Sequence, residues 1–161
     1  MAATKKRKLK IRLRKARLAD AKNIHALINL AAREGAVIPR SLSEIYESIR
    51  DFQIAEADRR LVGCCALHID WEDLAEIRSL VIDPEHQRIG LGSRLLKSAL
   101  KEARELLVPR VFALTAHPAF FEKNGFERIR RGRLPHKIWG DCLKCPKFPK
   151  CDEVALWKKL S

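Results

Sequence analysis

The sequence predicts a single α/β domain, and three observations support that prediction. The chain has 161 residues, of which 47% are hydrophobic, enough to bury one sizeable core. Short apolar runs separated by turn residues recur along the chain and predict about six or seven strands. Residues 75–107 read as a strand, a glycine-containing loop and a long amphipathic helix.

The first part of the chain predicts a strand, two helices and a hairpin. Apolar and charged residues alternate over residues 9–13, as in a half-exposed strand. Asp20 is the predicted cap of a helix that ends near Gly35. Residues 41–44 form a capping box that opens a second helix. Residues 52–69 then predict a hairpin around a polar turn.

The central segment, residues 75–107, begins with a strand that ends at Ile82. The following Asp83-Pro84 ends it because proline has no N–H to donate to a sheet ladder. From Ser93 onward, apolar residues recur at steps of three and four, which predicts a helix with one buried stripe. The stripe comprises Leu95, Leu96, Ala99, Leu100, Ala103, Leu106 and Leu107.

The loop before this helix contains Gly90 and Gly92, which allow unusual backbone dihedrals and close approach of a ligand. Free N–H groups at a helix N-terminus form an anion site suited to a pyrophosphate, and Arg88 and Arg94 add positive charge. No Gly-Lys-Ser/Thr ending is present, and Leu95 stands where the third glycine of Gly-x-Gly-x-x-Gly belongs. Both of those nucleotide-binding motifs are therefore excluded.

The remaining elements are short. Residues 111–115 predict a strand, and His117-Pro118 begins a short helix over residues 119–124. Gly125-Phe126 closes that helix. Residues 154–160 are a candidate last strand.

Two motifs resemble the GNAT N-acetyltransferases. Gln-x-x-Gly-x-Gly at 87–92, after a Val-Ile-Asp-Pro strand end, resembles their acetyl-coenzyme A loop, and Phe-Phe-Glu-Lys-x-Gly-Phe at 120–126 is a second landmark. The resemblance implies a mixed, mainly antiparallel sheet splayed between its fourth and fifth strands. It also implies acetyl-coenzyme A as co-substrate, with strand residues along the pantetheine arm and loop residues at the pyrophosphate. These residues are Leu80, Val81, Ile82, Gln87, Arg88, Ile89, Gly90, Leu91, Gly92 and Ser93.

Four segments extend this resemblance. Residues 39–41, 71–80, 113–115 and 134–139 look like the short amino-acid N-acetyltransferases of the N-acetylglutamate synthase type, and the similarity covers nearly all of residues 11–160. It implies acetylation of the α-amino group of an amino acid in the first step of arginine synthesis. Glutamate is the favoured acceptor and glutamine the alternative. Acetylation of a protein amine or a polyamine is a rival within the same class.

The acceptor residues are expected on the strand before the loop. Alternation places Glu76, Arg78, Leu80 and Ile82 on one face unless a bulge intervenes. A buried Glu and Arg are costly unless they are paired with each other or with a ligand, and both readings stay open. Glu76 is the candidate catalytic residue, and Arg78 with Arg40 would bind the acceptor carboxylates.

The resemblance fails at one catalytic position. Many GNAT enzymes carry a tyrosine in the helix after strand five as the acid that protonates the thiolate. Phe121 matches that position and cannot donate a proton. A water or the substrate ammonium would then supply it.

The net charge of +13 lies partly in a basic tail, residues 1–8, that precedes one domain over residues 9–161. A solvated tail is favoured over a nucleic-acid arm because no aromatic platform accompanies the charge. Basic charge also suits anionic coenzyme A. The alternative from another functional class is a basic, zinc-containing module associated with nucleic acid.

The sequence indicates a cytoplasmic protein. It has no apolar run near the ~20 residues of a membrane helix, and no secretory signal follows the basic N-terminus. Reduced thiols are then expected rather than disulfides, and Cys64 and Cys65 should be buried in the hairpin. A homodimer is left open.

The other thiols gather in a segment at 135–153. Their spacing begins like a zinc motif, but structural zinc takes four ligands, so His136 or Asp141 would have to complete the set. A reduced, proline-stiffened loop over the substrate is favoured, and no metal is assigned. The three cysteines are Cys142, Cys145 and Cys151.

Overall fold

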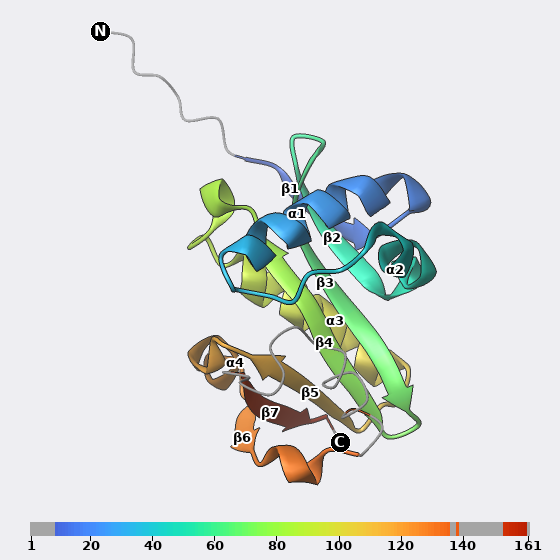
Figure 1. Ribbon diagram of the computed structural model, residues 1–161, viewed down its shortest axis with the longest axis vertical. Helices are drawn as coiled ribbons and strands as arrows, with labels where there is room; N and C mark the ends of the chain where they lie inside the picture. Colours follow the sequence, from blue (N-terminus) through green and yellow to red (C-terminus); the bar gives the residue numbers. More distant parts are fainter. Residues whose placement is uncertain (1–8, 136–137, 139–152, 161) are drawn as a thin grey trace, which may run out of the picture.

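The computed structural model describes residues 9–135, 138 and 153–160, which form one sheet covered by helices (Figure 1). The strands are β1 (Ile11–Lys15), β2 (Phe52–Ala57), β3 (Arg60–Trp71), β4 (Leu74–Ile82), β5 (Arg110–Thr115), β6 (Glu127–Ile129) and β7 (Val154–Lys159). The α-helices are α1 (Ala21–Arg33), α2 (Leu42–Glu47), α3 (Leu91–Glu105) and α4 (Pro118–Lys123). Short 3₁₀ turns are η1 (Leu18–Asp20), η2 (Ile49–Asp51), η3 (Pro84–His86) and η4 (Arg131–Arg133).

The predicted sheet, including its splay, is confirmed. The strands lie in the order β1-β2-β3-β4-β5-β7-β6, and every neighbouring pair is antiparallel except β4 and β5. β4 and β5 are parallel and pair only at Ala75 with Val111 and at Glu76 with Phe112. Figure 1 shows the two strands diverging from this paired end. Beyond these two residue pairs, the facing edges of β4 and β5 are not paired with each other and can make other contacts.

Helices cover both faces of the sheet. The α3-face core packs the stripe of α3 against β2, β3 and β4, and the α1-face core packs α1 and α2 against the opposite side. Cys65 lies in the first core and Cys64 in the second, both with 0% exposure, as predicted. Burial raises the pKa of the Cys64 thiol to about 12 and also raises that of Cys65, so neither is an available nucleophile.

Helix α3 is shifted relative to the sequence prediction. It begins at Leu91 rather than Ser93, so Gly92 belongs to its first turn. The predicted stripe was wrong at its end, because Leu106 and Leu107 are 56% and 85% exposed. The helix stops at Glu105, and the chain turns so that Val108 is buried in their place.

Asp20 occupies the N-cap position of α1, as predicted, but its side chain does not cap the helix. It makes no capping hydrogen bond to α1; instead its Oδ2 accepts from the N–H of Arg17 at 2.7 Å and from Arg14 Nη1 at 2.8 Å. The hydrogen bonds from Arg14 lower the pKa of Asp20. Asp20 therefore ties η1 to β1. The capping box of α2 is confirmed, since Ser41 and Glu44 exchange side-chain to backbone hydrogen bonds.

Several sequence predictions fall on other parts of the chain. The basic tail and the cysteine cluster, Cys142, Cys145 and Cys151 with His136 or Asp141, lie outside the described residues. Within the described residues, no helix is both long and apolar enough to cross a bilayer.

Candidate active site

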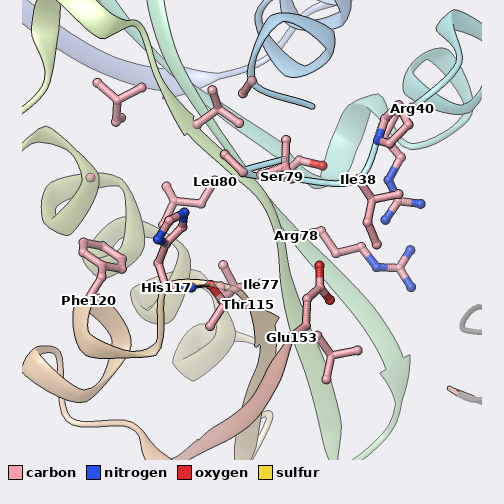
Figure 2. A pocket seen from close by; sticks show the side chains of 18 of the residues that line it. Ile38, Arg40, Ile77, Arg78, Ser79, Leu80, Thr115, His117, Phe120 and Glu153 are labelled. Carbon is pink, nitrogen blue, oxygen red and sulfur yellow. Dashed lines mark hydrogen bonds between the residues drawn. The ribbon is translucent and has the colours of Figure 1, made fainter. Parts of the chain in front are cut away.

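The splay between β4 and β5 opens into a cleft of about 610 Å³. Its walls come from β4, from α1 and the segment leading to α2, and from the end of β5 with the start of α4. Figure 2 shows Arg40, Arg78 and Glu153 gathered on one side of this cleft and His117 with Phe120 on the other. The cleft runs along β4 from Glu76 to Gln87 beyond the end of the strand.

A β-bulge interrupts β4 where it lines the cleft. Arg78 pairs with Ala66 and Val81 pairs with Cys64, so two residues of β4 stand opposite the single Cys65. The two bulged residues are Ser79, whose φ is +50°, and Leu80. An extra residue in a strand is left outside the hydrogen-bond ladder. The carbonyl of Ser79 accepts from Cys64 Sγ at 3.3 Å, and both bulged residues line the cleft, so the unpaired backbone of the bulge lies beside the space for a substrate.

The bulge also changes which side chains share a face. Ile77 packs in the α3-face core, and Leu80 and Ile82 pack against the same core. They follow Ile77 by three and five positions, which in a regular strand would place them on the opposite face. Glu76 and Arg78 point to the opposite face. The expectation that Glu76, Arg78, Leu80 and Ile82 share one face is therefore wrong, because the bulge at Ser79 and Leu80 reverses the alternation.

The loop before α3 has the geometry of an anion site. Gly90 is the N-cap residue with φ +79°, and Arg88 also has a positive φ of +65°. The first helical hydrogen bond runs from the N–H of Arg94 to the carbonyl of Gly90 at 3.1 Å. The N–H groups of residues 91–93 come before this bond and have no partner within the helix. Gly90, the N-cap residue, has no side chain that could cap them. Together with the helix dipole they favour a phosphate group.

The cleft takes in half of the predicted coenzyme residues. Gln87 Nε2 donates to the carbonyl of Ile82 at 3.2 Å and so joins the loop to the strand end. The side chain of Leu91 is buried in the α3-face core, so only its backbone can face a ligand. Leu80, Val81, Ile82, Gln87 and Gly92 line the cleft, whereas Arg88, Ile89, Gly90, Leu91 and Ser93 do not.

The predicted acceptor residues meet at the other end of the cleft. Glu76, Arg78 and Arg40 all line it. Glu76 is only 8% exposed, and Arg78 Nε donates to its Oε2 at 2.6 Å. Burial raises the pKa of Glu76 above its usual range, because loss of hydration penalises the carboxylate more than the charge of Arg78 favours it. A raised pKa makes the carboxylate a better proton acceptor than an ordinary glutamate.

Sequence reasoning missed several cleft residues on distant elements. Arg131 of η4 and Glu153 before β7 line the acceptor end, and Arg131 Nη2 donates to the carbonyl of Glu153 at 3.0 Å. Thr115 and His117 line the opposite wall, where Thr115 Oγ1 accepts from the N–H of His117 at 2.9 Å. The basic run at 128–133 was the one local signal for Arg131.

The aromatic residues at the start of α4 supply no proton donor. Phe120 and Phe121 both line the cleft, and Phe121 is 6% exposed. Its ring packs edge-on against Phe120 at 5.2 Å and against Phe126 at 5.1 Å between centroids. Phe121 therefore contributes packing beside the cleft rather than acid catalysis.

Comparisons of sequence agree with this geometry. The family described as "Acetyltransferase (GNAT) domain" matches residues 48–128. An uncharacterised N-acetyltransferase of Chlorobaculum tepidum is 41% identical over 148 residues, covering 92% of this chain and 96% of the relative. An amino-acid acetyltransferase of Mycobacterium tuberculosis is 36% identical over 135 residues, covering 82% of this chain and 77% of the relative.

Solved structures lead to the same family. N-acetylglutamate synthase from Neisseria gonorrhoeae, complexed with coenzyme A and N-acetyl-glutamate, superposes with a TM-score of 0.87 at 29% identity over 96% of this chain and 36% of that one. Rv2747 from Mycobacterium tuberculosis, in complex with CoA and NLQ, gives 0.80 at 26% identity over 93% and 99%. The chain therefore belongs to the GNAT acetyltransferase family and is an acetyl-coenzyme A dependent N-acetyltransferase.

Proposed function

We propose that the enzyme acetylates the α-amino group of an amino acid, with glutamate as the favoured acceptor and glutamine as the alternative. Relatives named amino-acid acetyltransferase and the N-acetylglutamate synthase structure support an amino-acid acceptor. The observation that carries the proposal is the grouping of Arg40 and Arg78 beside the buried Glu76 in one cleft. A role in the first step of arginine synthesis and a cytoplasmic location belong to the same proposal.

The arrangement fits direct attack of an amine on a thioester. The amine must lose a proton, the developing oxyanion needs donors, and the sulfur must leave as the carbon–nitrogen bond forms. Glu76 is the group suited to take the proton, since its pKa is raised by burial. The bulged backbone at Ser79 and Leu80 is suited to meet the oxyanion.

The two ends of the cleft suit the two substrates. Glu76 and Ile82 are six positions apart, a length of about 20 Å along an extended strand. The N-terminus of α3 beyond Ile82 suits the phosphates of the coenzyme, and Arg78 with Arg40 suits the carboxylates of an acidic acceptor. An arginine can bind a carboxylate through two parallel hydrogen bonds, which favours an amino acid over a polyamine.

A thiol-release assay over the twenty amino acids, spermidine and a lysine-containing peptide tests the acceptor class. We expect glutamate to give the highest kcat/KM and the polyamine and the peptide to give rates near background. Preferential acetylation of the polyamine or the peptide would overturn the proposal. The polyamine and the lysine side chain are cationic, so Arg40 and Arg78 in the cleft would repel them and would not bind them.

Substitution of Gly90 with valine tests the coenzyme loop. A side chain added at Gly90 would meet no protein atom within 4 Å, so its effect comes from the backbone at φ +79° and from obstruction of a ligand. We expect the KM for acetyl-coenzyme A to rise about tenfold or more, with a smaller change in the KM for glutamate.

Gly35 provides the matched control for that variant. It also has a positive φ, +76°, and open space around it, but it lies in the cleft wall after α1, between Glu34 and Ala36, and not in the loop before α3. Gly35→Val should show a similar loss of stability without the change in coenzyme KM. Equal coenzyme KM values for Gly90→Val and the parent would contradict the assignment of the loop.

A further inference from the structure

A hydrogen-bonded pair next to Glu76 has no part in the proposed function. His68 of β3 and Asp51 at the end of η2 are joined by a contact of 2.8 Å between Nδ1 and Oδ2. The carboxylate of Asp51 fixes the imidazole and keeps a proton on Nδ1, so Nε2 is the nitrogen that remains for proton exchange. This is the arrangement of an oriented histidine, formed by residues 17 positions apart in the chain.

His68 is the direct cross-strand neighbour of Glu76. Opposed residues of an antiparallel pair point to the same face, with Cβ atoms about 5 Å apart. For this pair it is the face that bears α1 and α2, since Ala66 packs in the α1-face core and the alternate residue Leu67 packs in the α3-face core. A Cβ separation of this order is compatible with proton exchange between the imidazole and the carboxyl group through one bridging water.

Exposure increases from Glu76 outward. Glu76 is 8% exposed and lines the cleft, whereas the side chains of His68 and Asp51 are 35% and 26% exposed and lie outside its lining. A base at the bottom of a cleft that holds two substrates must release its proton once in every turnover. His68 is the more exposed cross-strand neighbour of that base.

The other charged groups around Glu76 are poor substitutes for this role. The guanidinium groups of Arg78 and Arg40 favour the carboxylate by their charge but have no site that accepts its proton. Asp70 also acts on Glu76 through its charge, but it is itself only 6% exposed. Unlike these groups, His68 has a ring nitrogen that can both accept and donate a proton, and its side chain is 35% exposed.

We propose that His68, oriented by Asp51, carries the proton that Glu76 takes from the acceptor ammonium out to solvent. The ammonium loses one proton to the Glu76 carboxylate, the carboxyl group passes it to Nε2 of His68, and the imidazolium releases it to water, so that both side chains return to their starting states. The amine is left neutral for attack. His68 is thus a positioning and relay residue, and the inference rests on the proposed function of Glu76.

The test is His68→Gln, which removes the titrating ring and keeps a polar side chain. We expect kcat to fall about tenfold, the KM for acetyl-coenzyme A to stay the same, and added imidazole to restore much of the rate. A merely structural role would not respond to imidazole. His25→Gln, at a partly buried position on α1 outside the cleft lining, is the matched control and should behave as the parent.

Asp51→Asn keeps the ring but weakens its orientation, so a smaller loss of kcat in the same direction is expected. It provides a second reading if His68→Gln does not fold. A parental kcat in folded His68→Gln, or a loss that imidazole does not restore, would overturn the relay. Failure of the proposed function would look different, because the parent enzyme would then not acetylate amino acids or Glu76→Gln would be fully active.

Discussion

Glu76→Gln is expected to lower kcat by about two to three orders of magnitude, the usual contribution of a well-placed general base. Glutamine has nearly the same shape and can still accept the hydrogen bond that Arg78 donates at 2.6 Å, so the fold should survive. It cannot accept a proton. Steady-state rates at saturating substrate, together with calorimetric binding of coenzyme A, would show lost turnover with coenzyme binding unchanged.

The pH dependence gives a second measurement on the same variant. Burial raises the pKa of Glu76, so the parent enzyme should lose activity as pH falls through a value above the ordinary one of about 4.3, because the base becomes protonated. In Glu76→Gln this loss of activity at low pH should no longer follow the pKa of Glu76. The residual rate should instead rise with pH as solvent deprotonates the acceptor amine.

A matched pair on the surface controls for the loss of a Glu–Arg contact. Glu122 accepts from Arg128 at 2.9 Å, but the two side chains are 44% and 57% exposed and Glu122 lies outside the cleft lining. Glu122→Gln should leave kcat and its pH profile as in the parent. A parental kcat in Glu76→Gln would mean that Glu76 serves only as the partner of Arg78.

The strand, loop and helix of residues 74–105 could be predicted because their signals are local. Pro84 has no N–H to donate to a sheet ladder, which marks the end of β4, and the apolar steps of the helix can be read without knowing its neighbours. The start of α3 was missed by two residues because glycine is a weak helix former. Gly92 nevertheless lies in the first turn, where a Cβ would meet the ring of Phe120 at 3.4 Å.

The bulge in β4 could not be predicted from β4 alone. Its position depends on the register with β3, where Cys65 faces two residues instead of one. The sequence of the strand is compatible with regular alternation, and regular alternation would have put Glu76 and Leu80 on one face. Pairing between strands therefore decides which side chains reach the acceptor and which line the coenzyme side.

The composition of the site shows the same division between local and distant signals. The coenzyme loop lies within a few residues of sequence, so its motif was visible. Arg131 and Glu153 reach the acceptor end from η4 and from the residue before β7, and no motif connects them with Arg78. Asp20 failed as a predicted cap for a similar reason, since Arg14 on β1 competes for its carboxylate.

The structure makes two roles for Arg78 testable. Its Nε donates a hydrogen bond to Glu76 Oε2 at 2.6 Å, and its side chain lines the acceptor end of the cleft together with Arg40. Loss of the guanidinium would remove a charge that favours the Glu76 carboxylate, which should raise the pKa of Glu76 further and move the acid limb to higher pH. If Arg78 acted only through the pKa of Glu76, the activity lost in the variant would return at a pH well above the acid limb of the pH profile.

Arg78→Ala should lower kcat/KM for glutamate by about two to three orders of magnitude even at high pH, because a bidentate contact to a desolvated carboxylate is worth roughly 3 to 4 kcal/mol. The KM for acetyl-coenzyme A should stay near that of the parent, since the N-terminus of α3 lies beyond the far end of β4. Arg78→Lys should recover little, because a lysine cannot make two parallel hydrogen bonds. If folded Arg78→Ala regains parental kcat/KM at high pH, Arg78 acts only as the partner of Glu76, and the acceptor carboxylate is bound elsewhere.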